Sequence, residues 1–141
     1  MLQAVRAAVI TAALRLLDAG LVRGTSGNVS ARDGDLVAVT PTGVDYRRLD
    51  AASVPVVGLD GRVVDGRLAP SSELPLHLAV YRARPDVGAV VHTHSTFATT
   101  FAVLGEELPA VRRAVEAVVA LFTLFAGFEG DDVPALDAEE R

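Results

Sequence analysis

An apolar run over residues 88–91 ends in two histidines one residue apart, His92 and His94. A run of this length predicts a buried strand. Because side chains alternate across a strand, both imidazoles are expected on the same face. Two adjacent imidazoles pack poorly but make a good pair of metal ligands. The alternative is a hydrogen-bonded polar cluster. In either case the chain must fold so that the end of this strand meets a polar site.

The residue types that are present and absent limit the reactions that the chain can catalyse. All thirteen basic residues are arginine, and the chain contains neither lysine nor cysteine. A Schiff base with a carbonyl substrate requires a lysine amine, and a disulfide or a thiolate ligand requires cysteine. If the chain activates a carbonyl compound, a metal is the obvious electrophile that remains. The net charge of −5 and the lack of a basic stripe argue against a nucleic-acid surface.

The length and hydropathy of the chain predict one domain. Its 141 residues, half of them hydrophobic, suffice for one core. The N-terminal residues lack the order of a signal peptide. No uninterrupted apolar stretch reaches the ~18 residues that a membrane span needs. We therefore expect a cytoplasmic protein that binds neither nucleic acid nor membrane.

Hydrophobic periodicity and turn residues predict an alternation of helices and strands. We expect helices over about 2–20, 73–84 and 96–104, and strands over 36–39, 54–57, 62–64 and 88–92. The Asp60-Gly61 turn joins two of these strands as a hairpin. One face of the second helix is expected to carry Leu74, His77, Leu78 and Tyr81.

Three loops, over residues 24–30, 40–43 and 70–73, place small polar residues beside glycine or at a helix start. Glycine lets backbone N–H groups approach a ligand closely, and hydroxyl and amide side chains add further donors. The N-terminus of a helix also favours an anion. Converged, the three loops would make a phosphate cradle without any basic residue. Taken singly, each loop is a turn or a helix cap.

Two further side chains belong with these loops. Glu73 at the helix start has an ordinary role as a carboxylate that complements the helix dipole. Its functional role would be that of a third metal ligand, a general base, or each in turn. His77 lies one turn later, where we expect a half-buried helix residue or a hydrogen-bond donor to a ligand.

Four motifs, in this order and at this spacing, resemble the class II aldolase and adducin-head family, most closely its L-fuculose-phosphate aldolase branch. They are Gly24-Thr25-Ser26-Gly27-Asn28-Val29-Ser30, Thr40-Pro41-Thr42-Gly43, Pro70-Ser71-Ser72-Glu73 and Val90-Val91-His92-Thr93-His94. The resemblance runs from the first helix to about Ala110. It implies an α/β fold of three layers, α/β/α, with a mixed, mostly antiparallel central sheet.

The resemblance also implies roles for single residues. His92 and His94 correspond to two of the three zinc-binding histidines of the family. Glu73 corresponds to the glutamate that donates and accepts the proton and also touches the metal. The segments that hold the phosphate of the substrate correspond to Gly27, Asn28, Thr42, Gly43, Ser71 and Ser72.

The activity implied is cleavage of a small ketose phosphate, similar to L-fuculose 1-phosphate, to dihydroxyacetone phosphate and an aldehyde. One zinc ion per chain and a phosphorylated sugar are the expected cofactor and partner. The expected assembly is a homo-oligomer, since relatives are tetramers. Two alternatives stay open: sugar-phosphate epimerisation or dehydration at a similar site, and a non-catalytic domain like the adducin head.

The chain departs from the family pattern after residue 110. No histidine follows His94, so the third zinc histidine is absent, and Arg112 and Arg113 stand where close relatives carry a His-Tyr pair. We expect residues 1–113 to form the family's N-terminal domain, with a fold incomplete at its C-terminus. Residues 114–141 are expected to form a divergent apolar segment and an acidic tail. Weaker metal binding and impaired activity would follow.

Overall fold

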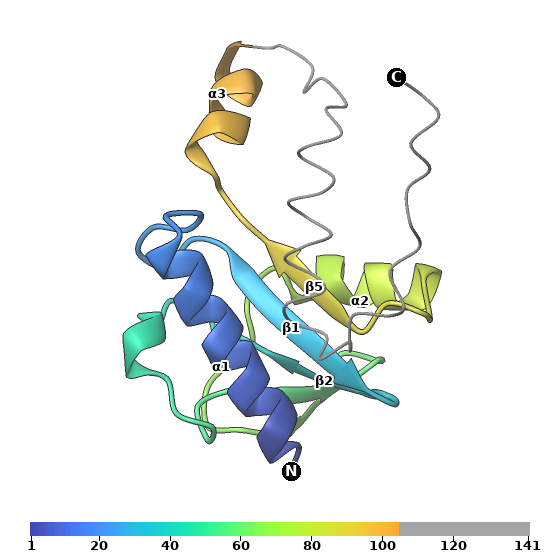
Figure 1. Ribbon diagram of the computed structural model, residues 1–141. Helices are drawn as coiled ribbons and strands as arrows, with labels where there is room; N and C mark the ends of the chain where they lie inside the picture. The colour runs from blue at the N-terminus through green and yellow to red at the C-terminus, as the bar shows by residue number, and fades with distance from the viewer. Residues whose placement is uncertain (105–141) are drawn as a thin grey trace, which may run out of the picture. The chain divides into compact units, whose positions relative to one another are not determined.

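Five strands form one sheet in the order β4-β3-β2-β1-β5, and every pairing among them is antiparallel (Figure 1). A computed structural model describes residues 1–104. Its strands are β1 (Asn28–Asp33), β2 (Leu36–Val39), β3 (Val56–Gly58), β4 (Val63–Asp65) and β5 (Ala89–His92). Its helices are α1 (Gln3–Asp18), α2 (Leu74–Ala83), α3 (Thr96–Leu104) and the short 3-10 helix η1 (Tyr46–Arg48). The expected domain boundary at 113 and the segment 114–141 lie outside the described residues.

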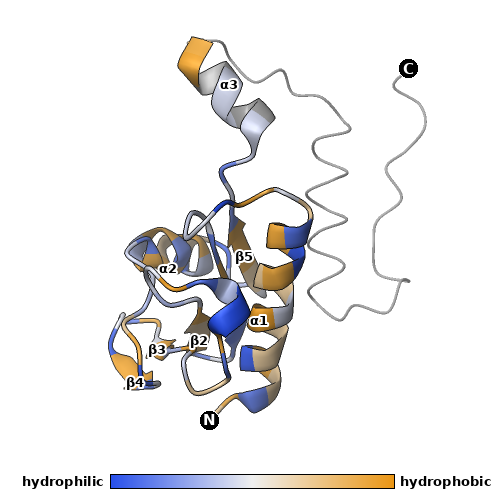
Figure 2. Ribbon diagram, turned by 90° about the vertical axis from the view of Figure 1, so that its left-hand side faces the viewer, coloured by the Kyte–Doolittle hydropathy of each residue, from blue (hydrophilic) through white to orange (hydrophobic). Residues whose placement is uncertain are grey.

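Helix α1 covers one face of the sheet, where it lies against β1 and β2 (Figure 1). Its buried apolar side chains recur at helical spacing, as the periodicity predicted; they are Val9, Ala12, Ala13 and Leu16. The helix ends at Asp18, and Gly20 follows with a φ of 68°, a left-handed conformation that suits glycine after a helix. Figure 2 shows polar and apolar residues alternating along α1, as expected for a helix buried on one side.

Helix α2 covers the opposite face. The four side chains expected to share one face of this helix are all buried there: Leu74, His77, Leu78 and Tyr81. The apolar members pack with sheet residues into one core cluster, to which the sheet contributes Val37, Val39, Val57 and Val90. Helices on both faces of an antiparallel sheet confirm the predicted three layers.

The predicted loop over residues 24–30 is wrong at its second half. Residues 28–30 belong to β1, which runs between β2 and β5 in the sheet. Asn has low strand propensity, and both Asn and Ser are common turn residues, so the local signal favoured a loop. The backbone of β1 is hydrogen-bonded on both sides, and this pairing decides the conformation. The polar side chains of Asn28 and Ser30 are consequently buried inside the domain.

The register between β1 and β5 positions the polar end of the apolar run. Asn28 pairs with His92, and Ser30 pairs with Val90. Because side chains at directly opposed positions share a face, Asn28, Ser30 and His92 all project towards the side that α2 covers. No helix among residues 1–104 is long and apolar enough to cross a membrane.

Candidate metal centre

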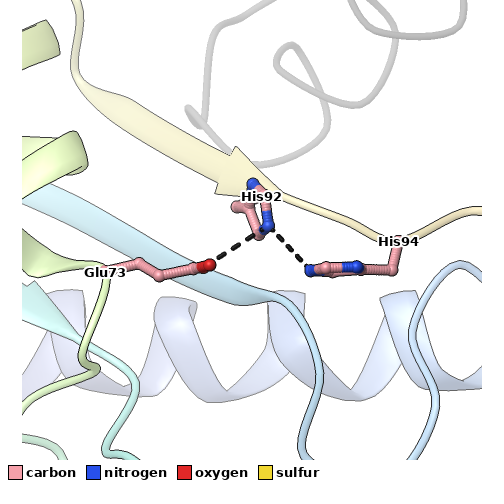
Figure 3. Close-up of side chains that lie close together, drawn as sticks. All are labelled: Glu73, His92 and His94. Carbon is pink, nitrogen blue, oxygen red and sulfur yellow. Dashed lines mark hydrogen bonds and ion pairs between the residues drawn. The ribbon is translucent and has the colours of Figure 1, made fainter. Parts of the chain in front are cut away.

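Three ligand-bearing side chains meet where β5 ends and α2 begins (Figure 3). Glu73 occupies the N-cap position of α2, His92 is the last residue of β5, and His94 follows in the connection to α3. One ligand atom from each lies within 4.8 Å of the others. The Nε2 atoms of His92 and His94 are 2.9 Å apart, and His92 Nε2 is 3.4 Å from Glu73 Oε2.

The chemistry of these donors fits a divalent metal. Two imidazole nitrogens and one carboxylate oxygen make a ligand set that zinc accepts, with a coordination position left for water or substrate. Two histidine nitrogens 2.9 Å apart must share one hydrogen between them. A cation can replace that hydrogen and bind both nitrogens. His92, His94 and Glu73 would therefore hold the ion.

A chain of hydrogen bonds holds Glu73 from the side of the protein core. The Asn28 amide nitrogen donates to Glu73 Oε2, and the Asn28 amide oxygen is hydrogen-bonded to His77 Nε2. On the other side of the imidazole, His77 Nδ1 lies 2.6 Å from Ser30 Oγ. Ser30 Oγ in turn lies 2.8 Å from the Tyr81 hydroxyl. Apart from Glu73, these residues are all buried between β1 and α2.

Burial determines the protonation states of the titratable residues in this hydrogen-bonded series. The pKa of His77 is lowered to about 4, mainly by desolvation; the nearby His92 adds to this shift, and Glu73 opposes it. His77 is therefore neutral near pH 7. Burial likewise raises the pKa of Tyr81 to about 12, so its hydroxyl keeps its proton. The buried residues of this hydrogen-bonded series therefore carry no net charge.

A polar pocket of about 120 Å³ lies beside the three ligands. All six residues expected to hold a phosphate line it, namely Gly27, Asn28, Thr42, Gly43, Ser71 and Ser72. Two of the loops run side by side, because the Ser71 N–H donates to the Thr40 carbonyl at 3.0 Å and the Thr42 N–H donates to the Ala69 carbonyl at 3.1 Å. Several hydroxyl-bearing side chains line the pocket, and no arginine is among the described residues that line it.

Gly27 brings the first loop against the end of β5. Its φ is 75°, and a Cβ added there would lie 2.7 Å from the His92 carbonyl oxygen and 2.5 Å from Val22 Cγ1. Only glycine combines this left-handed conformation with so close an approach. The Tyr46 hydroxyl donates to the Gly27 carbonyl at 2.6 Å and anchors the loop from the other side.

Sequence reasoning missed the parts played by Ser30, Tyr46 and Tyr81. A signal for two of the partners was present, because Glu73, His77 and Tyr81 follow one another at intervals of four residues, which places them along one side of a helix. Ser30 carries no such signal, since its role depends on the β1–β5 pairing. Asn28 lines the pocket as expected, but its side chain is engaged by Glu73 and His77.

The fold and the site together define a class of protein: a three-layer α/β domain in which a carboxylate and two imidazoles converge beside a polar pocket. Comparison with known proteins agrees with this class. Residues 7–139 match the family described as Class II Aldolase and Adducin N-terminal domain. The chain therefore belongs to the class II aldolase and adducin N-terminal domain family.

Individual relatives support the same family. A 5-deoxy-D-ribulose 1-phosphate aldolase from Bacillus thuringiensis serovar kurstaki is 44% identical over 113 residues, which are 79% of this chain and 53% of the relative. An L-fuculose phosphate aldolase from Escherichia coli K12 is 38% identical over 77% of this chain and 50% of the relative. The solved structure of an L-fuculose 1-phosphate aldolase superposes with a TM-score of 0.73 at 38% identity, covering 78% of this chain and 53% of the other. The chain thus spans about half the length of the relatives it matches.

Proposed function

We propose that this chain is the metal- and phosphate-binding part of a zinc-dependent aldolase, which cleaves a small ketose phosphate to dihydroxyacetone phosphate and an aldehyde. The observation that carries the proposal is the position of Glu73. Its carboxylate lies between the His92 imidazole and the polar pocket, and it borders both. The relatives named above act on 5-deoxy-D-ribulose 1-phosphate and L-fuculose phosphate, which are phosphorylated ketoses.

The pocket residues would bind and orient the phosphate group. Backbone N–H groups and the hydroxyls of Thr42, Ser71 and Ser72 can donate to phosphate oxygens without supplying any charge. Neutral donors contribute more to the orientation of the bound phosphate than to its affinity, because each phosphate oxygen must lie where an N–H or O–H group points. The bound phosphate would then fix the reacting carbon beside Glu73.

His92, His94 and Glu73 would hold the metal. When bound, the ion would supply Lewis acidity at the oxygens of the ketose, where negative charge develops as the carbon–carbon bond breaks. His92 is held in place as the last residue of β5, and His94 follows it in the connection to α3. Glu73 would take up or return the proton at a carboxylate oxygen. If it leaves the metal to do so, two protein ligands remain in this chain, and we expect weaker metal binding than in relatives with a third histidine.

We also propose that copies of this chain assemble into a homo-oligomer. A homo-oligomer is expected from the resemblance to tetrameric relatives, and light scattering of the purified chain would measure it directly.

The first test is elemental analysis of the purified, dialysed chain and of a His92→Ala variant. We expect about one zinc ion per wild-type chain and a sharp loss in the variant, because the variant lacks the central ligand. Ser95→Ala is the control, since it changes a neighbouring polar residue that is no part of the ligand set. Equal zinc in wild type and His92→Ala would overturn the assignment of the site.

The second test is a product assay with several ketose phosphates. Release of dihydroxyacetone phosphate identifies aldol cleavage, because epimerisation and dehydration do not release it. Conversion of a substrate without that product would favour an epimerase or a dehydratase. Absence of any conversion by a zinc-loaded chain would favour the non-catalytic domain.

A further inference from the structure

The buried polar chain behind Glu73 has only one consistent direction of hydrogen-bond donation. A carboxylate only accepts, so the amide nitrogen of Asn28 must face Glu73 Oε2. The amide oxygen of Asn28 then faces His77 Nε2, and an oxygen acceptor needs a hydrogen on that nitrogen. His77 therefore carries its proton on Nε2.

The same reasoning fixes the direction of the hydrogen bonds at the Tyr81 end of the series. A neutral imidazole with its hydrogen on Nε2 has a lone pair on Nδ1, so Ser30 Oγ donates to Nδ1 across 2.6 Å. Having used its one hydrogen, Ser30 must accept from the Tyr81 hydroxyl across 2.8 Å. Every donor in the series thus points along one path, from Tyr81 through Ser30, His77 and Asn28 to the Glu73 carboxylate.

We infer that His77 is a positioning residue, which acts through Asn28 to orient the Glu73 carboxylate towards the metal ligands and the pocket. His77 is fully buried and does not line the pocket, and its ring nitrogens are hydrogen-bonded to Ser30 and Asn28. Its Nε2–H group prevents the Asn28 amide from rotating, since a rotated amide would place an NH₂ group against N–H and an oxygen against the carboxylate. The catalytic importance of this positioning rests on the function proposed above, but the direction of the hydrogen bonds does not.

The inference predicts which substitutions the position tolerates. Glutamine at position 77 can present a side-chain amide N–H near the place of Nε2 and still donate to Asn28. Asparagine is shorter; its amide reaches the region of Nδ1 beside Ser30 and leaves the Asn28 oxygen without a donor. A purely space-filling role would not separate these two variants in this way.

Nitrogen NMR tests the tautomer in the wild-type protein. The chain contains three histidines, and the signals of His77 are identified as those missing from a His77→Gln sample. With ¹⁵N-labelled histidine at pH 7 in the metal-free protein, we expect a protonated Nε2 and an unprotonated Nδ1 for His77. The opposite tautomer, or an imidazolium, would overturn the inference whatever reaction the protein catalyses.

Zinc affinity and kinetics of three variants test the positioning. Partners that orient metal ligands are typically worth about 10–100-fold in metal affinity or activity. We expect His77→Asn to lose zinc affinity and kcat by that order with KM little changed, and His77→Gln to retain most of both. Tyr81→Phe is the matched control, because it removes a buried hydroxyl at the far end of the series and leaves Asn28 held.

Two outcomes would contradict the positioning role. One is an equal loss in His77→Asn and His77→Gln, and the other is a loss in Tyr81→Phe as large as that in His77→Asn. If no variant and no wild-type protein shows aldol cleavage, the proposed function fails, while the NMR and zinc-affinity measurements still decide the inference.

Discussion

At the scale of single residues, the carboxylate of Glu73 combines three neighbours. It accepts from Asn28, lies 3.4 Å from His92 Nε2, and borders the polar pocket. Its exposed fraction of 40% leaves it accessible to a substrate. A carboxylate that is both anchored and accessible suits repeated proton transfer, because it returns to the same place after each one.

Replacing Glu73 by glutamine keeps the shape of the side chain and the acceptor for Asn28 but removes the base. General acid–base residues contribute about 10²–10⁴-fold to rate. We expect Glu73→Gln to lower kcat for aldol cleavage by that order, while His92 and His94 still bind zinc, with lower affinity, when the ion is supplied in excess. Steady-state kinetics with elemental analysis of the same samples would measure both. Full residual activity would remove Glu73 from the catalytic role.

His77 predicts a dependence of stability on pH. Its pKa is about 4 in the folded protein, where burial is the main cause, and about 6.5 when unfolded. Below about pH 6.5 the His77 imidazole binds a proton in the unfolded chain but not in the folded protein. The free energy of unfolding therefore falls as the pH falls towards 4. The largest slope from this group is about 1.4 kcal/mol per pH unit. Urea unfolding of metal-free protein between pH 7 and 4.5 would show it.

The control for this dependence is His77→Gln, which cannot titrate. The variant should lose stability less steeply than wild type over the same pH range. Identical slopes would mean that His77 does not remain neutral in the folded protein.

At the scale of elements, the junction between the first loop and β5 depends on Gly27. Alanine there must adopt a φ of 75°, at a cost of about 1–2 kcal/mol. Its Cβ would also lie 2.5 Å from Val22 Cγ1 and 2.7 Å from the His92 carbonyl oxygen, and overpacking of this kind costs about 1–3 kcal/mol. We therefore expect Gly27→Ala to lower both the free energy of unfolding and the zinc affinity.

Gly24 in the same loop separates the two effects. Its φ of 59° is also left-handed, but an added Cβ would find nothing within 4 Å. Gly24→Ala should therefore show only the conformational cost and leave zinc affinity unchanged. Chemical unfolding with zinc titration of the two variants would measure this, and equal zinc affinity in both would contradict the close approach of Gly27 to β5.

The elements also show how far sequence alone predicts this protein. Periodicity placed α1, α2, β2 and β5 correctly, because each buries a face with a regular repeat. It missed β1 altogether, because the polar residues Asn28 and Ser30 become buried only through pairing with a strand much later in the chain. The same long-range pairing creates the partners of His77. Local patterns thus pointed to the candidate ligands, and tertiary contacts were needed to find the residues hydrogen-bonded behind Glu73.

At the scale of the whole molecule, a bound metal would stabilise the fold. The three ligands come from two separate segments, at the start of α2 and at the end of β5, and the unfolded chain does not hold them together. Binding to the folded state alone stabilises by about 2.7 kcal/mol at a ligand concentration of 100 times Kd. We expect zinc to raise the urea midpoint of wild type and to leave that of His92→Ala unchanged. Equal shifts in both proteins would place zinc elsewhere.

The pairing of β5 with β1 has a consequence for the order of folding. Asn28 and His92 are paired across the sheet although most of the described chain lies between them. Contacts this remote in sequence carry a large loop-closure entropy and tend to form late, after the hairpin β1–β2 and its neighbours are in place. The metal ligands would then come together at the final step of assembly. Amide exchange along β5 would report how often the finished centre opens.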